Sequence, residues 1–157
     1  MDTFRIFLSS PGDVAEERLI ARRVIERLRS EFVGRVAIDP VFWEHEPLAA
    51  SASFQDQLPH PADAHAAICV LWSRLGTRLP GSFRKPDGSS YASGTEFEFE
   101  DALAGFRRNG RPTLLVYRKT APPLLDADDD AQSLDRLQQK QALDAFVRRW
   151  FHDETDG

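Results

Sequence analysis

The stretch Ala66-Ala67-Ile68-Cys69-Val70-Leu71-Trp72 is an unbroken run of apolar residues. A strand with one wet face alternates polar and apolar residues, whereas a short continuous apolar run is typical of a strand covered on both faces, as in a parallel sheet. A long segment rich in glycine and proline, residues 73–93, follows the run. Long loops inside compact domains are usually functional or mobile. We therefore expect a buried parallel strand that leads into such a loop.

Strand-like and helix-like segments alternate on both sides of this run. Short apolar segments predict strands over Phe4–Leu8, Val36–Trp43 and Leu114–Tyr117. Apolar residues at helical spacing predict helices over residues 13–32, 95–109 and 131–151. Such alternation implies a parallel sheet wrapped by helices through right-handed crossovers. The expected fold class is α/β, a flavodoxin-like three-layer sandwich with a four- or five-stranded parallel sheet.

Local signals refine the first two elements of this scheme. Asp13 with Glu16 three residues later resembles a capping box, which predicts that Asp13 accepts hydrogen bonds from the first turn of its helix. Pro40 marks a bulge or an edge position in the second strand. The first helix repeats apolar residues every four positions, with Ala21 and Ile25 beside them, which predicts an amphipathic helix to about Phe32: Ile20, Val24, Leu28 and Phe32.

Length and charge describe one ordinary domain with an acidic end. The chain has 157 residues, of which 41% are hydrophobic, enough to build a core. The net charge is −5 and uneven: residues 1–123 hold 16 basic and 16 acidic side chains, whereas residues 124–157 hold 4 basic and 9 acidic ones. We interpret residues 1–123 as the α/β body and residues 124–157 as an acidic linker and closing helix.

Composition also argues against several classes of protein. A neutral body and a pI near 5.4 disfavour a nucleic-acid-binding surface. No apolar run approaches the ~20 residues of a membrane span, and the N-terminus lacks the layout of a secretory signal. Cys69 is the one cysteine, so an intrachain disulfide and a Cys-rich zinc site are excluded. We expect a cytoplasmic protein that binds neither nucleic acid nor membrane.

Common catalytic motifs are missing from the sequence. The glycine fingerprints G-x-x-x-x-G-K-[ST] and G-x-G-x-x-G do not occur after the first expected strand. The H-E-x-x-H zinc motif and a serine nucleophile elbow are absent too, and the histidines show no ligand spacing. The sequence therefore predicts no metal site and no triad hydrolase.

The expected ligand crevice lies at the carboxyl ends of the strands, where open α/β sheets bind their ligands. There Ser9, Ser10 and Gly12 offer hydroxyls and amides at a helix start, either an anion site or a simple turn. Trp43 could stack on a nicotinamide or adenine ring, or belong to the core. Arg74, with Arg78 nearby, could meet phosphates, or be a solvated loop residue.

An acidic helix start, Ser93-Gly94-Thr95-Glu96-Phe97-Glu98-Phe99-Glu100-Asp101-Ala102, is the most unusual feature. Acids near a helix N-terminus are favoured by the macrodipole, by ~0.3–1 kcal/mol each, which accounts for Glu96, Glu100 and Asp101. Glu98 differs because small residues, Ala102 and Gly105, follow it on its face of the helix. This face leaves room for a ligand against Glu98.

The same segment resembles two families of enzymes. Gly94, Thr95, Phe97, Glu98 and Ala102 match the G-T-x-F-E-hydrophobic-x-x-A segment of nucleoside 2-deoxyribosyltransferases, whose glutamate is catalytic. The segment is equally similar to the glutamate-bearing helix of TIR domains, whose glutamate is needed to cleave NAD.

Two further stretches extend the resemblance over about residues 4–119. Arg5-Ile6-Phe7-Leu8-Ser9-Ser10 with Glu17-Arg18, and Leu71-Trp72-Ser73-Arg74-Leu75-Gly76, look like a TIR-related family of unknown function. That family stands at the N-terminus of large STAND-class signalling ATPases, including bacterial defence proteins. The sequence departs from the TIR pattern in having no obvious fifth strand after Tyr117.

The resemblance implies a TIR-like effector domain that cleaves the nicotinamide–ribose bond of NAD or a related nucleotide, with Glu98 as catalytic carboxylate. NAD would then be substrate, and no cofactor is implied. Ser9, Ser10, Gly12, Trp43 and Arg74 are the expected substrate-binding residues. One alternative is a non-enzymatic module that self-associates, and another is base exchange between nucleosides. The family also implies an ATPase or sensor domain beyond this chain.

Overall fold

The computed structural model describes residues 2–42, 60–123 and 130–151, and it has an α/β fold. Its strands are all parallel and form one four-stranded sheet in the order β2-β1-β3-β4. The strands are β1 (Thr3–Ser9), β2 (Ala37–Phe42), β3 (Ala66–Leu71) and β4 (Thr113–Arg118). The helices are α1 (Ala15–Glu31), α2 (Gly94–Asn109) and α3 (Asp130–Phe151), with 3-10 turns η1 (Gly12–Val14) and η3 (Pro61–Asp63). The expected flavodoxin-like three-layer arrangement is confirmed, with four strands among the described residues.

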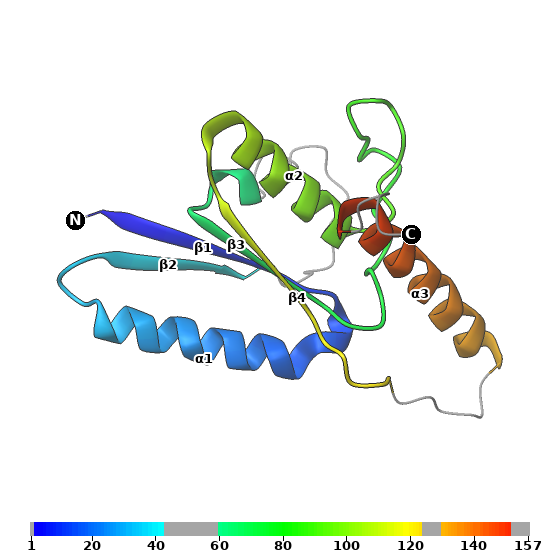
Figure 1. The fold of residues 1–157 in the computed structure, drawn as a ribbon, viewed down its shortest axis with the longest axis horizontal. Helices are drawn as coiled ribbons and strands as arrows, with labels where there is room; N and C mark the ends of the chain where they lie inside the picture. Colours follow the sequence, from blue (N-terminus) through cyan, green and yellow to red (C-terminus); the bar gives the residue numbers. More distant parts are fainter. Residues whose placement is uncertain (1, 43–59, 124–129, 152–157) are drawn as a thin grey trace.

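Helices lie on both faces of the sheet (Figure 1). Because side chains alternate along a strand, Phe7 of β1 packs with Ala102 of α2, whereas Leu8 packs in a cluster with Val14 on the opposite side. Figure 1 shows α1 on one side of the strands and α2 on the other. The next residue of β1, Ser9, therefore returns to the α2 face.

The apolar run Ala66–Trp72 contains β3, and both faces of this strand are covered. Cys69 and Leu71 belong to the cluster beneath α2, and Val70 belongs to the cluster on the α1 side. The neighbouring edge strand β4 is covered on one face only, so that Leu115 and Tyr117 are 41% and 57% exposed. Covering β3 on both faces explains why its sequence does not alternate.

At the opposite edge, β2 pairs with β1 in unbroken register, and Pro40 lies opposite Ile6. Pro40 is therefore at an edge, one of the two positions that the sequence allowed, and no bulge occurs there. An edge strand tolerates proline because its outward amide has no strand to pair with.

The apolar stripe predicted for α1 is buried only in part. Ile20 and Val24 are 58% and 52% exposed, whereas Ile25 is 2% exposed and Ala21 packs toward the sheet. The residue that fills the core just before the helix begins is Val14 of η1, which is fully buried. Val14, Ala21 and Ile25 form a second set of apolar residues at helical spacing. Ala21 and Ile25 are the residues of this set that α1 turns toward the core.

The predicted capping box at Asp13 is also wrong. Asp13 lies in η1, and no side chain caps α1 at its N-cap residue, Val14. Instead, Asp13 Oδ2 accepts hydrogen bonds from the backbone N and the Oγ of Ser73, at 3.0 and 2.8 Å. The carboxylate thus joins the turn after β1 to the residues after β3.

The last helix packs by its C-terminal half on the α2 side of the sheet. Leu143, Phe146 and Val147 join a core cluster with Phe99 of α2. Toward the other end of α3, Leu134 and Leu137 are 58% and 51% exposed. Within the described ranges, no helix combines the length and the apolar character needed to cross a membrane.

Candidate active site

Ser9 and Glu98 meet between the end of β1 and the first turns of α2. Ser9 Oγ donates a hydrogen bond to Glu98 Oε2, and the two residues are 4% and 6% exposed. They are 89 positions apart in the sequence. The pair lies at the carboxyl end of β1, next to β3, where the chain order of the strands reverses. Open α/β sheets bind ligands at such switch points.

Local sequence explains why α2 begins where it does. Ser93 is the N-cap residue and its Oγ accepts from the backbone N of Glu96 at 3.1 Å, which satisfies one of the free amides of the first turn. At the other end, Gly110 adopts the left-handed conformation with φ 71° and closes the helix. Glu98 is therefore held in the second turn of a helix with well-defined ends.

The small residues that follow Glu98 do not leave room for a ligand. Ala102 packs against Phe7 beneath the helix. A Cβ added at Gly105 would lie 2.9 Å from Cα and Cβ of Ala62 in η3. The small side chains let α2 approach η3 and the sheet closely, which overturns the ligand interpretation of this face.

Burial dominates the electrostatics of Glu98. Burial raises the pKa of its carboxyl to about 7, against the hydrogen bond from Ser9 and the positive charge of Arg18, which both lower it. At neutral pH the side chain is thus divided between its acid and carboxylate forms. A carboxyl poised near pH 7 can act in acid–base or electrostatic catalysis.

Cys69 lies beside this pair, a neighbourhood that the sequence did not reveal. The residue is paired with Ser9 in the β1–β3 ladder and is 1% exposed. The pKa of its thiol is raised to about 12, chiefly by burial and also by the charge of Glu98, while the hydrogen bond with Ser9 acts in the opposite direction. Cys69 is a core residue, as expected, and its thiol stays protonated at neutral pH.

We predict that Cys69 is inert in the folded protein, because the thiolate is the reactive form and this thiol is both buried and protonated. Incubation with iodoacetamide at pH 8 should leave the native chain unmodified over hours, as followed by intact mass spectrometry. In denaturant the same chain should take up one label, since it has one cysteine. Rapid labelling of the native protein would contradict the buried position.

Arg18 organises the turn after β1 and was missed as a site residue. Its Nε donates to Ser10 Oγ at 2.8 Å, and its Nη2 donates to the carbonyl oxygens of Ser10 and Pro11 at 3.0 and 3.2 Å. Ser10 is 7% exposed, whereas Gly12 is exposed. The sequence does show an arginine in the first turn of the first helix, just after the turn that follows β1, and this feature could have pointed to Arg18.

Trp43 and Arg74 are the remaining predicted substrate-binding residues. Trp43 lies outside the described residues. Arg74 is half-buried, and its Nε has no hydrogen-bond partner in the described part of the chain. Arg78 is exposed in the same loop.

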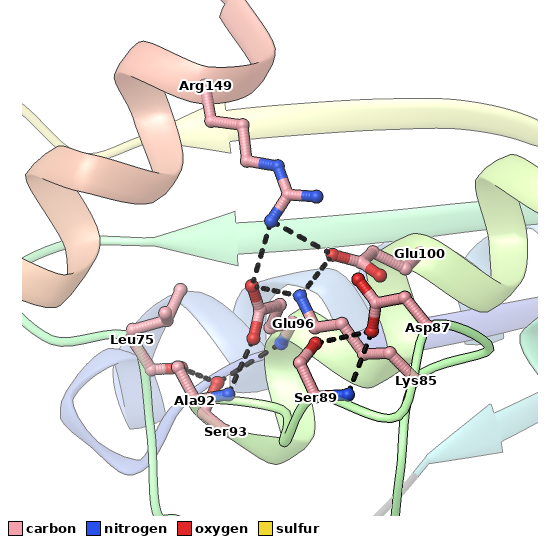
Figure 2. Close-up of polar contacts among 9 residues, drawn as sticks. All are labelled: Leu75, Lys85, Asp87, Ser89, Ala92, Ser93, Glu96, Glu100 and Arg149. Carbon is pink, nitrogen blue, oxygen red and sulfur yellow. Dashed lines mark hydrogen bonds and ion pairs between the residues drawn. The ribbon is translucent and has the colours of Figure 1, made fainter.

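Glu96 and Glu100 do more than complement the helix dipole. Lys85, in the loop before α2, donates to Oε1 of Glu96 at 2.9 Å and to Oε1 of Glu100 at 2.8 Å. Figure 2 shows the Lys85 ammonium between the two carboxylates, with Arg149 of α3 on their other side. The Arg149 Nη1 lies 3.9 and 3.8 Å from the same two oxygens.

This cluster fixes the loop to the helix that carries Glu98. Lys85 is 9% exposed and Glu96 is 7% exposed. Burial alone would lower the pKa of Lys85, but its hydrogen bonds to Glu100 and Glu96 raise it, so the ammonium keeps its charge. Glu96 Oε2 also accepts from the backbone N of Ala92 at 2.6 Å, just before the helix.

Other acidic residues also have hydrogen-bond or ion-pair partners. Asp101 Oδ2 accepts from the backbone N of Ala62 at 2.9 Å. Beyond β4, Lys119 Nζ lies 2.6 Å from Glu17 Oε1 and 4.2 Å from the ring centre of Trp72. Among the described residues, no three side chains are arranged to hold a metal ion.

Comparison of the chain with protein-family models, curated proteins and solved structures returned no match.

Proposed function

We propose that this protein cleaves the nicotinamide–ribose bond of NAD or a related nucleotide, and that Glu98 is the catalytic carboxylate. The observation that carries the proposal is the buried Glu98 at the carboxyl end of β1, bonded to Ser9. Perturbed carboxyl groups at such positions are candidates for function. The resemblance of the Gly94–Ala102 segment to TIR domains and deoxyribosyltransferases adds the reaction class.

The reaction suits a single carboxylate. When the bond between C1′ of the ribose and the nicotinamide nitrogen breaks, both bonding electrons go to the nitrogen and neutralise the pyridinium. The leaving group therefore needs no general acid. Positive charge develops on the ribose, as in other glycosyl transfers, and the negative Glu98 stabilises it. Water then adds to C1′ and releases a proton, which gives ADP-ribose.

The direct test compares nicotinamide release by the wild-type protein and by Glu98→Gln, at high protein concentration. We expect release by the wild type and a loss of at least about 100-fold in the variant, the effect of removing one group that stabilises transition-state charge. Glutamine keeps the size and hydrogen-bonding oxygen of the side chain but not its charge. Equal release by both proteins would exclude this role for Glu98.

A second candidate function is assembly without catalysis, and exposed apolar residues favour it. Leu19, Ile20 and Val24 on α1 are more than half exposed, and Tyr117 on the uncovered face of β4 is 57% exposed. Apolar surface of this kind is typical of protein–protein contacts. Under this proposal the chain self-associates when an ATPase or sensor domain clusters it.

Light scattering combined with the nicotinamide assay separates the candidates. Assembly without release at any concentration would favour the module, whereas release that depends on Glu98 would favour the enzyme. A deoxynucleoside incubated with a second free nucleobase tests the third possibility, because transfer of the deoxyribose from one base to the other would identify base exchange.

A further inference from the structure

The hydroxyl of Ser9 is held rigidly where it meets Glu98. Ser9 is the last residue of β1 and is paired with Cys69 in the parallel ladder, so its backbone belongs to the sheet. Its side chain follows Phe7 onto the α2 face and is 4% exposed. A hydroxyl with so few alternative partners and so little freedom can fix the orientation of the group that it binds.

The two oxygens of the Glu98 carboxylate have different surroundings. Oε2 accepts the hydrogen bond from Ser9. Among the residues that the structure describes, no side chain other than Ser9 donates to this carboxylate. Oε1 thus has no donor among these side chains, and under the proposed function it is the oxygen that faces the ribose.

Besides the hydrogen bond from the Ser9 hydroxyl, few charged groups influence the protonation of Glu98. From α1, the positive charge of Arg18 favours the carboxylate, and on β3 the Cys69 thiol is uncharged at neutral pH. On α2 itself, Glu96 and Glu100 pair with Lys85, and Asp101 accepts from the amide of Ala62. These contacts leave the Ser9 hydroxyl as the direct donor to Glu98.

We infer that Ser9 is a positioning residue, which donates to Oε2 of Glu98, favours the charged form of the side chain and presents Oε1 to the ribose. This differs from the substrate-binding role that the sequence suggested for Ser9, and it rests on the proposed function. In this arrangement Ser9 acts on the substrate through Glu98, not by contact.

Removing the hydroxyl should make Glu98 harder to ionise. In Ser9→Ala, Oε2 stays buried without its donor, so the pKa of Glu98, already raised by burial, rises further. The free energy of a hydrogen bond to a charged group corresponds to a change of about 1–2 in the pKa of that group. Ser9→Thr keeps a hydroxyl on a residue suited to a strand and should restore most of the wild-type behaviour.

The experiment measures two quantities for wild type, Ser9→Ala and Ser9→Thr. The first is the pH dependence of nicotinamide release. The second is the titration of the Glu98 carboxyl by 13C NMR, which needs no activity, with Glu98→Gln to identify its signal. Ser30→Ala is the matched control, because this serine lies on the exposed side of α1 and donates to the carbonyl oxygen of Glu26. Circular dichroism verifies that each variant is folded.

We expect both the acid limb of the rate profile and the titration to move upward by about 1–2 pH units in Ser9→Ala, with recovery of the rate at high pH. An unmoved titration in a folded Ser9→Ala protein would overturn the inference, whether or not the protein cleaves NAD. A shifted titration without nicotinamide release by any variant would support the Ser9–Glu98 coupling and reject the proposed function. Loss of nicotinamide release at every pH, with an unmoved titration of Glu98, would overturn the inference and indicate that Ser9 contacts the substrate directly.

Discussion

Lys85→Met is expected to lower the free energy of unfolding by about 3–5 kcal/mol, the usual cost of removing one partner from a buried ion pair. The side chains of Lys85 and Glu96 are 8% and 9% exposed, and that of Glu100 is 16% exposed. Without the ammonium, two adjacent carboxylates remain buried together. Arg149 cannot replace it, because its side chain is 55% exposed and lies 3.8–3.9 Å away. Urea unfolding followed by circular dichroism measures the change.

Two further variants isolate the cause of this loss. Lys140→Met is the matched control, because Lys140 also pairs with an acid, Asp144, but is 61% exposed. It should cost less than about 1 kcal/mol. Adding Glu96→Gln and Glu100→Gln to Lys85→Met should recover part of the stability, since no unpaired charge is then buried. A cost below about 1 kcal/mol for Lys85→Met itself would contradict the buried network.

Glu98→Gln is expected to become more stable relative to wild type as the pH rises. Because burial raises the pKa of Glu98 from 4.5 to about 7 in the folded protein, the folded state binds its proton more tightly than the unfolded state does. The stability that this proton contributes is complete below pH 4.5 and is lost as the pH rises to about 7. The whole change amounts to about 3 kcal/mol.

Glutamine is neutral at every pH and its carbonyl oxygen still accepts from Ser9, so the variant lacks this loss. The difference in free energy of unfolding between the two proteins, measured at pH 4, 6 and 8, isolates the contribution of Glu98 from that of other groups. Glu16→Gln, a change at an exposed position of α1, should run parallel to wild type. A difference that stays constant with pH would mean that Glu98 is not buried as described.

Elements that depend on neighbours in the sequence were predictable. The apolar run of β3, the Ser93 cap and the closing Gly110 are local signals, and each element lies within a few residues of its expected position. The inward face of α1 was not predictable from spacing alone, because two sets of apolar positions occur along it. The sheet selects the set that continues from Val14, and which set meets the sheet depends on how the turn before the helix is built.

The candidate site also has a part that local sequence predicts and a part that depends on distant contacts. A helix that starts near Ser93 and carries Glu98 in its second turn follows from local sequence, because capping and helical periodicity act over a few residues. The tertiary structure alone decided the partners: Ser9 and Cys69 at Glu98, Ser73 at Asp13, and Lys85 between Glu96 and Glu100. Carboxylates near a helix start look alike in a sequence. Their burial and their donors depend on which distant segments fold over them.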